Sequence, residues 1–226
     1  MIKWIFLSSI FLLFHPFSGW SQTWNYHIRT GDKTNNVCWS LNPEPDSGYV
    51  AVSENTQKGI FHKVLCDDSL ITRMWKFTNV GKNTSYCVER KGDSFFLKGI
   101  LNGKEIEKVI KKKGLDWYQF HGICIGEFVR SGLKKKKFLS FRPDNLKLYT
   151  LVGEGKERCK IEVNGRAVNA VKIRVHLAGL WSKIWKAEYW FRETDGLFLR
   201  YEAVNGFPGT PKTVYKLIEP EVLTVK

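Results

Sequence analysis

Apolar and polar residues alternate with a period of two along most of the chain, which is the pattern of half-buried β-strands. In residues 157–164, for example, Cys159 and Val163 share one face of the predicted strand. The strand runs into Asn164-Gly165, a pair that favours a type I′ turn because both residues tolerate positive φ. Alternation resumes in residues 171–175, so we predict that the two segments form a β-hairpin.

The same pattern recurs along the chain and predicts an antiparallel meander of roughly ten strands. Two further turn signals separate alternating runs: Asn102-Gly103 between 94–101 and 104–111, and Asp195-Gly196 between 185–192 and 197–203. Other strand candidates are residues 71–78, 85–90, 138–142, 146–152 and 213–218. Residues 24–59 hold short apolar runs between polar loops, and we expect them to be opening strands of the same sheet; the alternative is a separate small module.

A meander of this length is expected to curl rather than stay flat. Its last aromatic strand favours curling, because Trp185, Tyr189 and Phe191 share one face while Trp190 lies on the other. A strand that is apolar on both faces is covered on both sides or lines a cavity. We therefore predict an all-β fold, an antiparallel meander curled into an incomplete barrel, with Trp185 in the core and Trp190 at the cavity.

At most one or two short helices are expected in this fold. The best candidate is the segment 117–130, which we place across one mouth of the sheet, with Asp116 capping its start. Gly122 and Gly126 weaken this helix. Residues 105–113 also fit a helical pattern, but the Asn-Gly turn before them favours a strand.

The first 21 residues have the features of a signal peptide. Lys3 precedes an apolar run over residues 4–14, Pro16 ends the run, and Gly19 and Ser21 have the spacing that signal peptidase requires. The alternative is a membrane anchor, but the run is about half of the roughly 20 residues that a membrane-spanning helix needs. No cysteine lies near the cut, so the lipid-modified cysteine of a bacterial lipoprotein is not available.

Export is therefore expected, with the periplasm favoured over the extracellular space, and with no transmembrane segment in the mature chain. Cleavage after Ser21 would leave a length that suits a single β-rich domain. Its predicted parts are opening strands and loops in 22–59, the main curled sheet in 60–219 and a tail in 220–226.

The chain is strongly basic, with a formal net charge of +14. Lysines cluster at 111–113 and 134–137, and such a surface attracts polyanions or anionic membranes. The alternative, which we favour, is a solvated rim, since strands that must stay unpaired often carry lysine. The predicted contacts to an anionic surface are Lys134, Lys135, Lys136 and Lys137. Nucleic acid is a poor partner, because an exported protein is separated from the nucleic acid of the cell and no binding motif accompanies the lysines.

Five cysteines lie beyond the predicted signal peptide: Cys38, Cys66, Cys87, Cys124 and Cys159. An exported chain can form disulfides, but an odd number leaves at least one thiol unpaired, and the spacings do not choose among the possible pairings. No C-x-x-C motif occurs, so neither a zinc site nor a redox motif is supported. We expect no metal and no cofactor.

Residues 185–201, WKAEYWFRETDGLFLRY, resemble the final hairpin of a family of exported bacterial proteins of unknown function. In architecture, those proteins resemble the Lol lipoprotein carriers of the Gram-negative envelope. Residues 157–175 resemble the hairpin that precedes it, and the resemblance extends in pattern over residues 60–219. It implies an incomplete antiparallel barrel that holds an acyl chain under short helices. The carriers' ligand-gating residues have no counterparts that can be placed here, and the five cysteines are a departure, so the resemblance implies a fold rather than an activity.

No catalytic residues are predicted. His27, His62, His121 and His176 are scattered, and neither an H-E-x-x-H nor a G-x-S-x-G motif occurs. His121 and Cys124 lie three residues apart, but a Cys–His dyad is not defined by such spacing.

Three kinds of function therefore remain. We favour an exported binding module whose curled sheet holds an apolar or amphiphilic ligand, with Trp190, Trp75 and Phe198 as the predicted contacts. The plainer alternative for these aromatic residues is that they fill the core. The second kind is an envelope protein that docks through its basic strands to an anionic polymer or a protein partner. An enzyme with an unrecognised site is the least favoured.

Overall fold

The computed structural model describes residues 21–44, 48–112, 114–179, 182, 185–204 and 210–218. Within these ranges the chain forms one antiparallel sheet of 14 strands. The all-β fold and the incomplete barrel are therefore confirmed. The predicted signal peptide up to Trp20 and the predicted tail lie outside the described residues.

The first eight strands run outward from the middle of the sheet to one edge. They are β1 (Gln22–Thr30), β2 (Lys33–Pro43), β3 (Tyr49–Asn55), β4 (Ile60–Cys66), β5 (Thr72–Asn79), β6 (Thr84–Lys91), β7 (Ser94–Leu101) and β8 (Lys104–Lys111). The short 3₁₀ turns η1 (Thr56–Lys58) and η2 (Val80–Lys82) follow β3 and β5.

The chain then crosses to the opposite edge through the short helices α1 (His121–Cys124) and α2 (Gly126–Arg130). Six more strands return to the middle: β9 (Lys135–Phe141), β10 (Leu148–Val163), β11 (Arg166–Leu177), β12 (Lys186–Arg192), β13 (Phe198–Val204) and β14 (Lys212–Ile218). β14 pairs with β1, and every other strand pairs with its neighbour in the chain. None of the described helices is both long and apolar enough to span a membrane.

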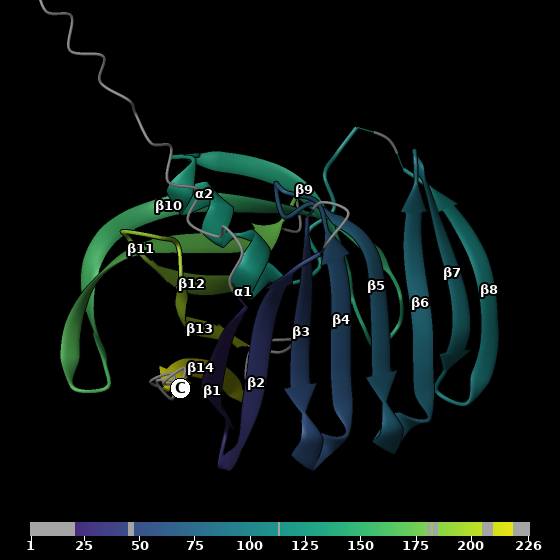
Figure 1. The fold of residues 1–226 in the computed structure, drawn as a ribbon, viewed down its shortest axis with the longest axis horizontal. Helices are drawn as coiled ribbons and strands as arrows, with labels where there is room; N and C mark the ends of the chain where they lie inside the picture. The colour runs from purple at the N-terminus through teal and green to yellow at the C-terminus, as the bar shows by residue number, and fades with distance from the viewer. Residues whose placement is uncertain are drawn as a thin grey trace, which may run out of the picture.

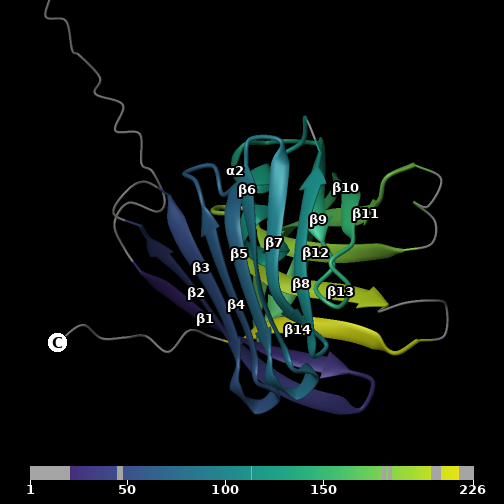
Figure 2. The same cartoon turned by 90° about the vertical axis from the view of Figure 1, so that its right-hand side faces the viewer.

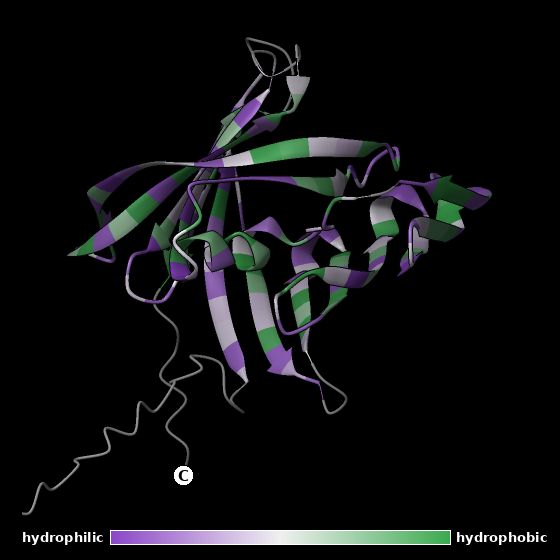
Figure 3. Cartoon of the chain, turned by 90° about the horizontal axis from the view of Figure 1, so that it is seen from above, coloured by the Kyte–Doolittle hydropathy of each residue, from purple (hydrophilic) through white to green (hydrophobic). Residues whose placement is uncertain are grey.

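The sheet curls over on itself, so that β10 to β14 cross the upright strands β3 to β8 (Figures 1 and 2). Apolar and polar residues alternate along the strands (Figure 3). The fully buried side chains come from both halves of the sheet, and among the largest are Tyr26, Trp75, Phe95, Phe138, Ile173 and Phe191. The core therefore lies inside the curl, between the two halves.

The edge strands β8 and β9 do not pair with each other in the described part of the chain. The extended segment 115–120, which we call the seam, lies against β9 instead. The Leu139 amide donates to the Asp116 carbonyl over 2.7 Å, and the Tyr118 amide donates to the Leu139 carbonyl over 3.0 Å. On its other side the Trp117 carbonyl accepts a hydrogen bond from the Thr72 amide, 2.8 Å away, at the start of β5. The seam thus joins the two halves of the barrel by backbone bonds.

Two of the three predicted turns have the expected conformation. Asn164 and Gly165 have φ values of 52° and 76°, and Asn102 and Gly103 have values of 50° and 78°, as a type I′ turn requires. Asp195-Gly196 differs, because it belongs to a longer loop in which the Gly196 amide bonds to the Arg192 carbonyl. The Asp195 carboxylate shapes this loop by accepting hydrogen bonds from the Arg192 guanidinium and the Leu197 amide.

The predicted strands 146–152 and 157–164 are parts of one strand, β10, which has 16 residues. A register shift between Gly155 and Glu157 absorbs the irregularity that the sequence pattern shows there. Gly153 lies in this strand because a Cβ atom at that position would stand 2.6 Å from the ring of Phe128 in α2.

The helix predicted over 117–130 is shorter than expected. It begins at His121, because the backbone of the preceding seam is bonded to β9 and β5. Asp116 does not cap it; its carboxylate pairs with the Lys136 ammonium at 2.7 Å. Gly122 is a weak helix former, but it allows α1 to approach the Trp39 ring closely, since a Cβ atom there would stand 2.3 Å from that ring. The helices can therefore press directly on the inner wall of the sheet.

Candidate ligand-binding cavity

The curled sheet encloses a cavity of about 510 Å³, within the range of small-molecule sites. Its walls come from β1 to β5, the ends of β6 and β7, and β12, β13 and β14, and α1 lies across it. The apolar part of the lining includes Ile28, Val37, Trp39, Phe77 and Phe120.

Along several of the strands that line the cavity, among them β1, β2, β3 and β5, the inward-facing residues change from apolar to polar. On β2, Leu41, Trp39 and Val37 give way to Asn35 as the strand nears its turn with β1. On β4, Val64 is followed in the same direction by His62 and then by the apolar Ile60, which also lines the cavity. The turns η1 and η2 lie at this polar end of the strands, and α1 lies toward the other end (Figure 1). The cavity is therefore apolar inside and polar at one mouth.

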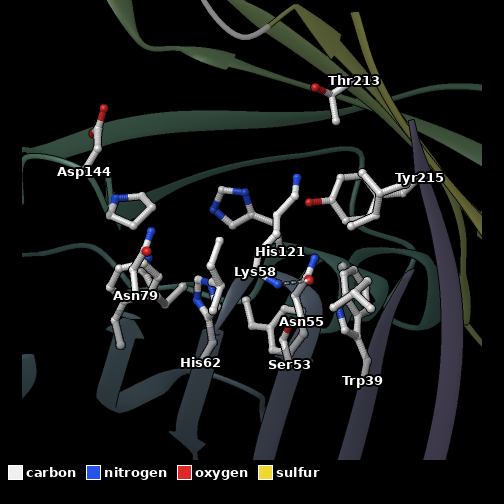
Figure 4. A pocket seen from close by; sticks show the side chains of 18 of the residues that line it. Trp39, Ser53, Asn55, Lys58, His62, Asn79, His121, Asp144, Thr213 and Tyr215 are labelled. Carbon is white, nitrogen blue, oxygen red and sulfur yellow. Dashed lines mark hydrogen bonds between the residues drawn. The ribbon is translucent and has the colours of Figure 1, made fainter. Parts of the chain in front are cut away.

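Two buried asparagines form the polar wall at this end. The Asn55 Nδ2 atom donates to Asn35 Oδ1 at 2.5 Å, and the Asn55 Oδ1 atom accepts from the Lys58 amide at 3.1 Å (Figure 4). Only 6% of each asparagine is exposed. The Nδ2 atom of Asn35 has no hydrogen-bond partner among the described residues. Leaving a buried donor unpaired costs about 1 to 3 kcal/mol, so this amide is available to an acceptor in the cavity.

The cavity also holds two neutral histidines. Burial lowers the pKa of His62 to about 4. Its Nδ1 atom accepts a hydrogen bond from Trp75 Nε1 at 3.4 Å, so the ring proton lies on Nε2 and that atom is a donor. Burial also lowers the pKa of His121 to about 4. Its two ring nitrogens lie 3.1 Å from the Tyr189 hydroxyl and 3.0 Å from Ser140 Oγ, which ties α1 to β12 and β9.

Two tyrosine hydroxyls add to the polar lining. Tyr201 and Tyr215 stand edge to face with their ring centres 5.3 Å apart. Neither hydroxyl has a hydrogen-bond partner in the described ranges of the chain. Burial raises the pKa of both phenols, so they stay protonated. Each can therefore donate to a bound molecule as well as accept from it.

The sequence-predicted ligand contacts lie outside this cavity. Trp190 faces away from Tyr189 and is covered by Lys172 and Arg200, whose charged groups lie 5.3 and 5.4 Å from its ring. Trp75 is fully buried beneath His62. Neither Trp190 nor Trp75 lines the large cavity, and a ligand contact at either residue stays a prediction.

Phe198, the third predicted contact, stacks on Trp39 with ring centres 5.0 Å apart. It lines a second hollow of about 80 Å³ beside Arg192 and Asp195. Trp185, which we assigned to the core, is partly buried and packs against it.

The lysine run 134–137 does not form one exposed patch. Lys135 pairs with Glu154 at 2.6 Å. Lys136 is half-buried, because it pairs with Asp116 at 2.7 Å and donates to the Tyr118 hydroxyl at 2.8 Å. Lys134 and Lys137 are exposed. Lys134 precedes β9, Lys135 and Lys137 lie on one face of the strand, and Lys136 lies on the other, so Lys136 is the member of the run that is not exposed.

The ring nitrogens of His121 contact the Tyr189 and Ser140 hydroxyls, and no hydrogen bond joins this ring to Cys124 among the described residues. The Cys66 and Cys124 thiols are both free and are neighbours, and the presence of Cys124 together with burial raises the pKa of the Cys66 thiol. No three histidine, cysteine or acidic side chains meet as a metal ion would require, within the ranges that the structure describes.

The residues that sequence reasoning missed are the polar ones on the inner face, above all Asn35, Asn55 and His62. A signal was present, because Asn35 continues the period-two series of Val37 and Trp39. A polar residue in an otherwise apolar series departs from the pattern of a plain core, and here it lies on the cavity wall.

The chain is similar in fold to a crystal structure of a beta-barrel-like protein of the domain of unknown function DUF1849 from Brucella abortus. The TM-score is 0.58 and the identity 11%, over 87% of this chain and 95% of that chain. It also matches the hypothetical lipoprotein YmcC from Escherichia coli, with a TM-score of 0.38 and 12% identity over 89% of this chain and 87% of that chain. No protein-family model and no curated protein matches. The first similarity shows the barrel-like fold alone, and the likeness to the Lol carriers stays a prediction.

Proposed function

We propose that this protein is a binding module of the bacterial envelope, exported to act there, that holds an apolar or amphiphilic, lipid-like ligand in the cavity of its curled sheet. The observation that carries the proposal is the change along the cavity wall, from Trp39 and Phe77 inside to Asn35 and His62 toward the mouth. An amphiphile has the same change along its length. The free Asn35 amide supports a ligand rather than a plain core, because a core would leave that donor without a partner.

The test is uptake of a fatty acid that carries an environment-sensitive fluorophore, together with mass spectrometry of lipids that copurify with the protein. Ser53 lines the cavity, so a Ser53→Phe substitution places a ring in the ligand's volume. The matched control is Ser85→Phe on the exposed face of β6. We expect saturable uptake by the wild-type protein, a loss of affinity of about tenfold or more in Ser53→Phe, and little change in the control.

Thermal unfolding of both variants shows whether they keep the fold. Absence of both uptake and copurified lipid from the wild-type protein would mean that the inner aromatic residues are ordinary core. Unchanged uptake by a folded Ser53→Phe variant would place the ligand outside this cavity.

A second proposed role is docking to an anionic polymer or membrane surface. It is supported by the exposed Lys134 and Lys137, which have no ion-pair partner in the part of the chain that the structure describes. The ion pairs of Lys135 and Lys136 support the same strand structurally and leave the other two lysines to make contacts.

A further inference from the structure

The cavity mouth carries two lysines without anionic partners. Lys58 ends η1 and Lys82 ends η2, and both line the cavity. The two turns lie side by side at the same end of the sheet (Figure 1), and Figure 4 shows Lys58 among the residues around the cavity. Neither ammonium group has an ion pair with any described residue.

The single acidic side chain among the described residues that line the cavity does not neutralise these lysines. It is Asp144, in the loop between β9 and β10. Its carboxylate is held by Arg142, whose Nε atom lies 2.7 Å from Oδ1 and whose Nη2 atom lies 2.7 Å from Oδ2. The mouth therefore keeps an excess of positive charge.

Two groups further in are donors as well, whereas the Tyr201 and Tyr215 hydroxyls can both donate and accept. Asn35 Nδ2 is unpaired and buried, and His62 presents a protonated Nε2 atom. An uncharged head group with one hydroxyl would satisfy few of these donors. A carboxylate or phosphate offers several acceptor oxygens and the charge that the mouth lacks.

We propose that the ligand is a single-chain amphiphile with an anionic head group, a carboxylate or a phosphate, bound at the mouth by Lys58 and Lys82. Its apolar chain extends inward along Phe77, Trp39 and Phe120. This inference rests on the proposed binding function and adds the chemical class of the ligand.

The experiment measures how well three ligands with the same chain displace an uncharged fluorescent probe from the cavity. The ligands are dodecanoate, dodecyl phosphate and dodecanol. We expect the two anions to bind about tenfold more tightly than the alcohol at low salt, and the difference to shrink as salt is added. The arm that binds more tightly, carboxylate or phosphate, identifies the source of the head group.

The decisive variant is the double substitution Lys58→Gln and Lys82→Gln, which removes the charge and leaves the backbone bond from the Lys58 amide to Asn55 intact. The matched control is Lys63→Gln with Lys76→Gln, a facing pair on the exposed side of β4 and β5. Both double variants lose the same net charge. We expect the preference for anions to fall to about twofold in the mouth variant and to persist in the control. Thermal unfolding confirms that each variant is folded.

The outcomes separate the two proposals. Equal displacement by the alcohol and the anions would overturn the anionic head group but leave the binding function standing. If the control variant lost its preference for anions as much as the mouth variant does, the anionic head group would be overturned too, because the effect would then come from overall charge. If the probe does not bind and no ligand is taken up, the binding function fails along with this inference.

Discussion

At the scale of single residues, the inner wall is defined by polar side chains whose buried state fixes their protonation. His62 and His121 are neutral at pH 7 because burial disfavours the imidazolium form. Each is held by a specific neighbour, Trp75 for His62 and the Tyr189–Ser140 pair for His121. The cavity thus presents donors and acceptors of fixed type at neutral pH.

These histidines predict an acid-dependent loss of stability. Each has a pKa of about 4 in the folded state and an ordinary value of 6.5, so the unfolded chain binds more protons between these values. The free energy of unfolding should therefore fall as pH drops from about 6.5 toward 4, by up to about 3 kcal/mol for each histidine. Denaturant titrations at several pH values between 4 and 7 measure this slope.

The variant that isolates the effect is His121→Gln, which should unfold with a shallower dependence on pH than the wild-type protein. Carboxylates titrate in the same range, so the comparison is between variants rather than with a theoretical slope. His27→Gln, at an exposed position on β1, is the matched control and should keep the wild-type slope. An identical slope in His121→Gln would contradict the buried neutral state.

At the scale of elements, the features that the sequence could predict depend on local patterns. The features that it could not predict depend on contacts between segments that are far apart in the chain. Hairpins around Asn102 and Asn164 were predictable, because the alternation and the turn residues lie within a few positions of each other. The start of α1 was not, since the partner strands of the seam are far away in the chain. The sequence also could not show which face of β12 is concave. In the structure Tyr189, rather than Trp190, lines the cavity.

The turn at Asn164-Gly165 gives a test of the hairpin. Gly165 has a φ of 76°, and no atom lies within 4 Å of where its Cβ would stand. A Gly165→Val substitution therefore adds backbone strain without a steric clash, and should reduce the free energy of unfolding by about 1 to 3 kcal/mol. Urea denaturation measures the change.

The control for this turn is Gly81→Val in η2. Gly81 lacks a positive φ, and its Cβ would have Asn79 Oδ1 at 3.7 Å as its nearest neighbour. We expect a smaller effect there. Equal losses at the two glycines would show that the β-branched side chain, rather than the left-handed backbone at Gly165, is responsible.

At the scale of the whole molecule, the chain has a net charge of +14. Its lysines fall into two groups, those whose side-chain contacts support the fold and those that face solvent. On β9, Lys136 belongs to the first group, through Asp116 and Tyr118. Lys134 and Lys137 belong to the second. The two groups should respond differently to loss of charge.

We predict that Lys134→Gln with Lys137→Gln leaves stability within about 0.5 kcal/mol per site and weakens retention on anionic liposomes, most clearly at low salt. Lys136→Gln should instead lower the free energy of unfolding by about 1 kcal/mol, because it leaves the Asp116 carboxylate without its cation. Cosedimentation at two salt concentrations and urea denaturation measure the two effects. Retention of the wild-type protein that is absent or independent of salt would rule out the surface role and favour a solvated rim.

The pairing of β1 with β14 has a topological consequence. These are the first and last of the strands that the structure describes, yet they lie in the middle of the sheet, with Asn25 opposite Ile218. A circular permutant opened in the crossing between β8 and β9, with the old ends joined by a linker, would therefore trace the sheet from one edge to the other in chain order. The fold is thus a simple up-and-down meander whose chain has been cut at its centre.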